Sequence, residues 1–304
     1  MLFFPSLSSF LSSLRTCNHV NSQGRSPLHE AIHQQAEREH PERVKDLLRR
    51  GADMDCKDRE GETPMMLAVR EGKEECVRAL LSAGEYRGQR ELKAVLEAAN
   101  IWDETCLHLA ASEGRLEMLN MLLEKGAPVN PQNDSGETPL MTAVVNGHES
   151  CARALMLAGA DLEMVDVNGG TALHMCSVRG HLPCVRMLLK ASANPNVKTK
   201  SKGDDPPAAC RRFWGHNPAL GLTDETMNSV LQELEGAQRW GRRWLAVMIQ
   251  SRQGDRVLVD AMVKRIWEGE GSEQDEQLRV LMGWVVSLPS HGMQGMFRQI
   301  VSFL

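Results

Sequence analysis

Four side chains that commonly bind metals lie close together in one segment of the sequence: His174, Cys176, His181 and Cys184. Imidazole and thiolate groups are usual ligands of zinc, so a zinc site is one interpretation of this cluster. Each of the four, however, stands at a repeating position that holds methionine, alanine or another histidine elsewhere in the chain. A residue that can be exchanged for methionine or alanine fills space, so we predict no metal site and no cofactor.

Other patterns that carry chemistry are absent or have a simpler structural explanation. The chain has no phosphate-binding glycine loop and no GxSxG. Residues 239–244 (RWGRRW) mix arginine and tryptophan as some nucleic-acid-binding proteins do. Trp240 and Trp244 are four residues apart and would share the buried face of a helix, leaving solvated arginines; an acidic protein or RNA partner is the alternative. We predict a protein that is not an enzyme and takes no small-molecule substrate.

Composition narrows the class of protein further. Hydrophobic residues make up 42% of the chain, aromatic residues only 4%, and there are 17 methionines, which suits packed helices. The net charge of −5 gives no basic footprint for nucleic acid, so nucleic acid is an unlikely partner. The eight cysteines fall at core-filling positions, which favours a reducing compartment. No apolar run is long enough for a membrane span, and we expect a cytoplasmic or nuclear protein.

A short signature recurs along the chain and predicts the helices that position any site. Its five copies begin at Ser26, Thr63, Thr105, Thr138 and Thr171, with intervals of 37, 42, 33 and 33 residues. Serine or threonine caps a helix N-terminus, and the proline that follows in three copies suits the first helical position. Each copy therefore predicts the start of a short helix.

Glycines and polar turns complete the repeating unit. A second helix with paired apolar residues follows the first in each unit. Glycine is expected to end it at Gly51, Gly84, Gly126 and Gly159, and Ser192 takes this place in the fifth unit. Polar turns at 58–61, 133–136 and 166–169 then begin with Asp or Asn and end with Gly. One such helix pair cannot bury its apolar face alone, so the units must stack.

These motifs resemble the ankyrin-repeat family over about residues 18 to 196. The matching features are the TPLH start, Gly-His between the helices, the LLxxGA close and the DxxGxT turn. The resemblance implies an all-α fold: a curved solenoid of about five antiparallel helix pairs, with β-hairpin fingers projecting from one side. It also implies protein–protein recognition with no chemistry of its own.

We divide the chain into four segments. Residues 1–19 are read as a partial N-terminal repeat or tail, with a targeting peptide as the alternative, and 20–196 as the array of five repeats. Residues 197–222 form a linker or a degenerate sixth repeat, and 223–304 a helical C-terminal domain of no recognised family. Extra residues at 34–40 lengthen the first unit. A second insertion at 85–99 predicts an added helical turn or two in a finger, where a partner-specific feature is most expected.

Ankyrin partners lie across the finger tips and the concave face formed by the first helices, and this implies a set of contact positions here. From the fingers it selects Arg59, Glu60, Glu62, Ile101, Trp102, Glu104, Asp134, Ser135, Glu137, Val167 and Asn168. From the first helices it selects Arg70, Glu71, Ser112, Glu113, Val145, Asn146, Val178 and Arg179. Ile101 and Trp102 are large and apolar at expected finger tips, so they either pack under the neighbouring insertion or anchor a partner.

The expected function is an adaptor or scaffold that binds a protein ligand of unknown identity on this surface. One alternative is the substrate-recognition subunit of a ubiquitin ligase, in which residues 293–304 would dock a scaffold protein. Another is that the C-terminal helices only cap the array.

Overall fold

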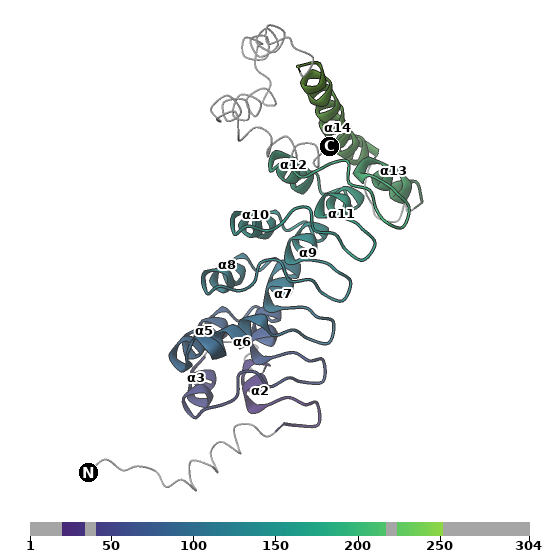
Figure 1. Ribbon diagram of the computed structural model, residues 1–304. Coiled ribbons are helices and arrows are strands. Elements are labelled where there is room, and N and C mark those ends of the chain that lie inside the picture. Colours follow the sequence, from purple (N-terminus) through teal and green to yellow (C-terminus); the bar gives the residue numbers. More distant parts are fainter. Residues whose placement is uncertain (1–19, 34–40, 217–223, 252–304) are drawn as a thin grey trace, which may run out of the picture.

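The computed structural model describes residues 20–33, 41–216 and 224–251 of the chain, and these form a curved stack of helix pairs (Figure 1). The expectations for residues 1–19, 34–40, 217–223 and 252–304 lie outside the described residues. Within the described ranges the only β-structure is one isolated bridge between Ala99 and Thr105. The predicted all-α repeat solenoid is confirmed, although its fingers are hairpin turns without extended strands.

Two rows of helices run along the stack. The first helices of the repeats are α2 (Pro27–His33), α4 (Pro64–Arg70), α7 (Cys106–Ser112), α9 (Pro139–Val145) and α11 (Ala172–Arg179). The second helices are α3 (Glu42–Arg49), α5 (Glu74–Arg87), α8 (Leu116–Glu124), α10 (Glu149–Leu157) and α12 (Leu182–Lys190). Consecutive first helices pack on one another, as do consecutive second helices, and a single apolar core runs through the stack. Each repeat thus buries the face that its neighbour would otherwise expose.

The first helices begin where the sequence signature places them. The hydroxyl of Thr138 accepts a hydrogen bond from the backbone N–H of Met141 (3.3 Å), and Pro139 takes the first helical position of α9. In the repeats whose signature holds histidine, the imidazole ring accepts a hydrogen bond from the backbone of the N-cap residue. The backbone N–H of Thr105 donates to Nδ1 of His108 (3.1 Å), so the proton sits on Nε2, which donates to the carbonyl of Glu137 in the next repeat (2.9 Å).

The prediction that Gly84 ends the second helix of the second repeat is wrong. Helix α5 continues through Gly84 to Arg87 and ends at Gly88, which has a φ of +121°. The additional helix α6 (Gln89–Glu97) then folds back onto α5, and a Cβ at Gly84 would lie 3.1 Å from Leu92. Gly84 therefore serves helix packing instead of helix termination.

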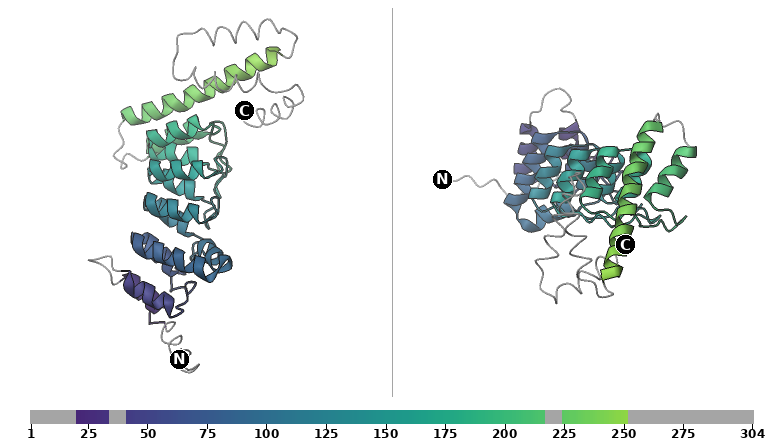
Figure 2. Two further views of the ribbon diagram at one scale, coloured as in Figure 1. Left: turned by 90° about the vertical axis from the view of Figure 1, so that its left-hand side faces the viewer. Right: turned by 90° about the horizontal axis from the view of Figure 1, so that it is seen from above.

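Two further helices close the C-terminal end of the stack. Helix α13 (Pro206–His216) packs on α11, and α14 (Asp224–Ser251) packs on α12 and α13, so they occupy the places of a first and a second helix. Cys210, Val230 and Leu234 are fully buried in these contacts. Helix α14 is much longer than the repeat helices and crosses the end of the array (Figure 2). Among the described helices, none is both long enough and apolar enough to cross a membrane.

Candidate functional site

The turns between repeats, here called fingers, share one local design. We number them finger 1 to finger 6, at residues 21–25, 58–62, 100–104, 133–137, 166–170 and 199–204. In fingers 1 to 5 an Asp or Asn comes first, and its side-chain oxygen accepts two backbone N–H bonds from inside the turn. Asn133, for example, accepts from Ser135 (3.1 Å) and Glu137 (2.8 Å). These bonds explain why the repeat requires Asp or Asn there.

Backbone hydrogen bonds join each finger to the next and make one continuous ladder. The N–H of Ile101 donates to the carbonyl of Glu60 (3.2 Å), and that of Asp134 donates to Trp102 (3.0 Å). The N–H of Val167 continues the series to Ser135 (3.1 Å). The finger tips are therefore fixed relative to one another before any ligand binds, which lowers the ordering entropy that binding costs.

Close contact between neighbouring fingers also explains their glycines. A Cβ at Gly61 would lie 2.8 Å from the backbone nitrogen of Ile101, and one at Gly136 would lie 2.9 Å from that of Val167. Finger 3 differs, because Asp103 adopts a positive φ of 58° where other fingers use glycine. Aspartate tolerates this left-handed conformation better than most residues.

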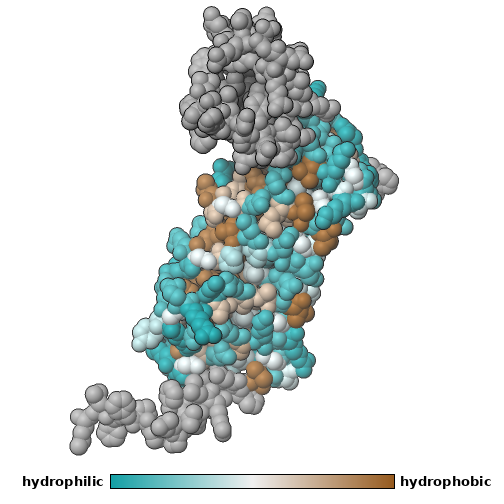
Figure 3. Space-filling model, in the orientation of Figure 1, coloured by the Kyte–Doolittle hydropathy of each residue, from teal (hydrophilic) through white to brown (hydrophobic). Residues whose placement is uncertain are grey.

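Three large apolar side chains are exposed on the fingers. Ile101 and Trp102 on finger 3 are 61% and 43% exposed, and Val167 on finger 5 is 62% exposed. Helix α6 therefore does not bury Ile101 and Trp102, which was one of the two outcomes expected from the sequence. In Figure 3, brown patches interrupt the teal surface along the edge from which the fingers project. Exposed apolar groups on a rigid edge are suited to contact a partner.

The C-terminal ends of the first helices adjoin the fingers, and together they form one surface that we call the finger face. The guanidinium of Arg70, at the end of α4, pairs with Glu62 (2.6 Å) and Glu60 (3.3 Å) of finger 2. The side-chain amide of Asn146, at the end of α9, reaches the hydroxyl of Ser112, at the end of α7 (3.5 Å). The ion pairs of Arg70 join a helix to the finger of its own repeat, whereas the contact between Asn146 and Ser112 joins neighbouring repeats.

Glu62 is the most unusual residue of the finger face. Its side chain is only 1% exposed, and Oε2 has no hydrogen-bond partner among the described residues. Burial, opposed by the charge of Arg70, raises the pKa of this carboxyl to about 7. The sequence selects Glu62 as a contact position, but its burial means that it can only position Arg70 for a ligand.

The other selected positions are all at least partly accessible. Those exposed are Arg59, Glu60, Ile101, Trp102, Glu113, Asp134, Ser135, Asn146, Val167, Asn168 and Arg179. Those half-buried are Arg70, Glu71, Glu104, Ser112, Glu137, Val145 and Val178. The structure thus brings these positions to one face, while their role in binding stays a prediction.

The four side chains that could have suggested zinc are engaged separately. Nε2 of His174 donates to the carbonyl of Asp204 (3.2 Å), and Nε2 of His181 donates to that of Val145 (3.0 Å). Cys176 and Cys184 are buried, which raises the pKa of both thiols. No group of three potential metal ligands gathers anywhere in the described part of the chain. The histidines of this segment serve to join the repeats.

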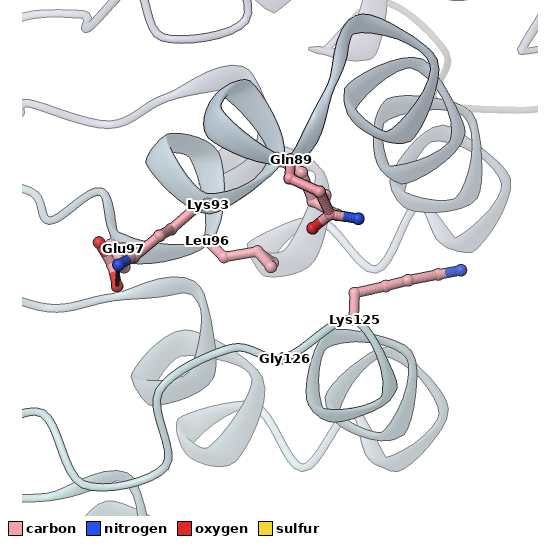
Figure 4. Close-up of a pocket in the computed structure, with 7 residues that line it drawn as sticks. Gln89, Lys93, Leu96, Glu97, Lys125 and Gly126 are labelled. Atoms are coloured by element: carbon pink, nitrogen blue, oxygen red, sulfur yellow. Dashed lines mark ion pairs between the residues drawn. The ribbon is translucent and has the colours of Figure 1, made fainter.

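A shallow groove of about 290 Å³ lies between α6 and the end of α8 (Figure 4). Leu92 and Leu96 are the apolar side chains that line it. Lys93 and Lys125 line its edges and are already paired, with Glu97 (3.6 Å) and Glu85 (2.6 Å) respectively. The groove is a surface feature of the α6 insertion and is not part of the finger face.

Sequence reasoning missed finger 6. Its turn has the same closing bond, from the N–H of Thr199 to the carbonyl of Asp204 (2.9 Å), and the N–H of Lys200 continues the ladder to Asn168 (2.8 Å). Thr199 replaces the usual Asp or Asn and the turn is one residue longer, so the repeat signature does not detect it. The spacing from Asp166 to Thr199, which is again 33 residues, is the signal that could have found it.

Comparison with known proteins agrees with this geometry. A family model described as ankyrin repeats (3 copies) matches residues 32–133 and 107–199, which together are more than half of the chain. NF-kappa-B inhibitor alpha of Sus scrofa is 35% identical over 115 residues, covering 38% of this chain and 34% of the relative. The B-cell lymphoma 3 protein homolog of Mus musculus is 33% identical over 139 residues, covering 45% of this chain and 29% of the relative. The matched segments thus span about a third of these relatives.

A solved structure shows the same architecture over most of the described residues. The ankyrin repeat domain of Bcl-3, described as a unique member of the IkappaB protein family, superposes with a TM-score of 0.60 at 29% sequence identity. The match covers 73% of this chain and 89% of that domain. The repeats, the finger ladder and these matches lead to one conclusion: the chain belongs to the ankyrin-repeat family, and its array is a protein–protein interaction module.

Proposed function

We propose that this chain is an adaptor that binds a protein of the NF-kappa-B type on its finger face. The observation that carries the proposal is the exposed apolar pair Ile101 and Trp102 at the centre of a rigid finger ladder. The names of the relatives, NF-kappa-B inhibitor alpha and NF-kappa-B inhibitor cactus, indicate the class of ligand. A preformed surface with a central aromatic side chain is the usual setting of a binding hot spot.

Binding of a purified NF-kappa-B protein, measured by isothermal titration calorimetry, tests the proposal. We expect Trp102→Ala to weaken binding about thirtyfold or more, because hot-spot truncations cost roughly 2 kcal/mol or more. Leu157→Ala is the matched control, since Leu157 is 85% exposed but lies at the end of α10, away from the fingers. Equal affinities of the wild type and Trp102→Ala would remove finger 3 from the interface. Absence of any binding would reject the ligand class.

We further propose a cytoplasmic or nuclear location and a role without catalysis, as expected for an adaptor. The ubiquitin-ligase alternative depends on residues 293–304, which lie outside the described residues, and no contact of the described residues favours it over the adaptor.

A further inference from the structure

Finger 6, together with the residue before it, carries a cluster of three lysines that the other fingers lack. Lys198, Lys200 and Lys202 lie within five residues of one another and are all exposed. No carboxylate of the described residues forms an ion pair with any of them. Lys200 also covers Gly169, where a Cβ would lie 2.6 Å from its backbone nitrogen, so the base of its side chain is held against finger 5.

The nearby acidic side chains are occupied by other partners. Asp204, at the end of finger 6, pairs with Arg212 of α13. Asp205 caps α13 by accepting from the backbone of Ala208 (2.9 Å) and also accepts from Gln238 (3.0 Å). Asp166 accepts the N–H groups of its own turn. The three lysines therefore present their ammonium groups to solvent without an ion-pair partner among the described residues, and the charges of Asp166 and Asp205 stay bound within their own hydrogen-bond networks.

The extent of the patch limits what it can bind. Finger 5 offers the uncharged Val167 and Asn168, and beyond it finger 4 presents the acidic Asp134 and Glu137. On the other side, Arg211 of α13 is paired with Glu235. A nucleic acid that followed the ladder would meet these carboxylates, whereas a short anionic segment would meet only the lysines.

We propose that finger 6 binds a short acidic segment of a protein partner, with Val167 of finger 5 contacting an apolar residue next to it. Three lysine ammonium groups complement three or four carboxylates, and the backbone bond between Lys200 and Asn168 holds the basic and apolar parts side by side. The proposal rests on the proposed function, since it places a second contact on the same protein-binding face. The contact at finger 6 depends on the charge of the lysines, whereas the contact at finger 3 depends on apolar surface.

A fluorescein-labelled peptide of one leucine followed by six glutamates is the probe, titrated with the full chain at low ionic strength. We expect measurable binding that falls at least tenfold in the triple variant Lys198→Glu, Lys200→Glu, Lys202→Glu. The matched control reverses three exposed outer-helix cations, Arg49→Glu, Arg90→Glu and Lys93→Glu, and thus makes the same change in net charge. This control should retain at least half of the wild-type affinity.

Two further measurements separate the remaining outcomes. The triple variant with glutamine in place of the lysines should also lose binding, and circular dichroism should show an unchanged helix content in every variant. Equal weakening in the outer-helix control would mean that only net charge matters and would overturn the proposal. So would tighter binding of a 20-base-pair DNA duplex with the same lysine dependence. Binding of the NF-kappa-B protein is measured separately with Trp102→Ala, so either proposal can fail alone.

Discussion

At the scale of single residues, Glu62 is the side chain least suited to its surroundings. Its carboxyl is buried at the base of finger 2, and its pKa is raised from 4.5 to about 7. The folded state therefore holds this proton more tightly than the unfolded state does. The stability that Glu62 contributes is complete below pH 4.5 and is lost as the pH rises to about 7.

Replacing Glu62 with glutamine should remove this loss. We expect Glu62→Gln to raise the free energy of unfolding by roughly 1–3 kcal/mol at pH 8 and by less at pH 5, because the amide never ionises. Urea unfolding at the two pH values measures the difference. Glu60→Gln is the control, because Glu60 pairs with the same arginine but is exposed to solvent. We expect it to change stability by less than about 1 kcal/mol. A constant gain at both pH values would contradict the assigned cause.

Ser192 is a second residue in a strained setting. It has a positive φ of 68° at the position where Gly51, Gly126 and Gly159 end the second helices of other repeats. We expect Ser192→Gly to stabilise the chain by about 0.5–1 kcal/mol, since glycine adopts this conformation without a Cβ clash and its extra unfolded-state entropy offsets only part of the gain. Thermal unfolding measures the change. Ser192→Ala keeps the Cβ, so any similar gain from alanine would show that backbone strain is not the reason.

At the scale of elements, the repeats are not all connected by the same hydrogen bonds. His29, His108 and His174 each donate from Nε2 to a carbonyl of the following finger, and burial lowers the pKa of all three. Met66 and Met141 hold the same position in the other two repeats and cannot donate. The backbone N–H of Thr138 meets only the sulfur of Met141, at 3.5 Å.

Met141→His should supply the hydrogen bond to finger 5 that methionine cannot make. Its Nε2 would donate to the carbonyl of Gly170, and we expect a gain of about 1 kcal/mol at pH 7.5. Because burial would lower the pKa of the new histidine, as it does for His108, the gain should decline as the pH falls below 6.5. Chemical unfolding at pH 7.5 and 5.5 measures both effects. Met141→Leu fills the same space without a donor, so a gain from leucine would argue against the hydrogen bond.

Local sequence signals were sufficient for the elements that local chemistry fixes. Thr138 and Pro139 indicate the start of α9, and Asn133 indicates the turn before it, because each acts through bonds within a few residues. Gly84 was misjudged because its role depends on Leu92 of α6, a contact between helices. For the finger face, the sequence placed Ile101 and Trp102 at a tip but could not show the burial of Glu62. That burial depends on how fingers 2 and 3 stack against each other.

Local sequence signals were also insufficient for α13, which lies beyond the recognised repeats. It lacks the threonine–proline start, and its place beside α11 is set by packing and by the bond from His174 to Asp204. The sequence therefore left residues 197–222 open between a linker and a degenerate repeat. The structure places α13 and α14 as a terminal helix pair, and the domain boundaries at 196 and 222 remain predictions.

At the scale of the whole molecule, the main contacts among the described helices join neighbouring units. The effect of a destabilising substitution should therefore depend on where in the array it is made. Leu234 of α14 and Leu119 of α8 are both fully buried leucines, one at the C-terminal end and one near the centre. Truncating either side chain to alanine should cost about 2–5 kcal/mol locally. The two losses affect different numbers of neighbours, because α14 packs mainly on α12 and α13, whereas α8 packs on helices of the repeats on both sides.

Hydrogen exchange followed by mass spectrometry distinguishes the two consequences. We expect Leu234→Ala to speed exchange in α11 to α14 by tenfold or more, while α4, α7 and α9 keep their protection. Leu119→Ala should speed exchange on both sides of α8 and lower the midpoint of the main unfolding transition. If Leu234→Ala loosened the entire array to the same degree, the terminal pair would act as an obligatory cap for all repeats. If it changed nothing outside α14, the long helix would be an appendage whose buried leucine does not stabilise the last repeat.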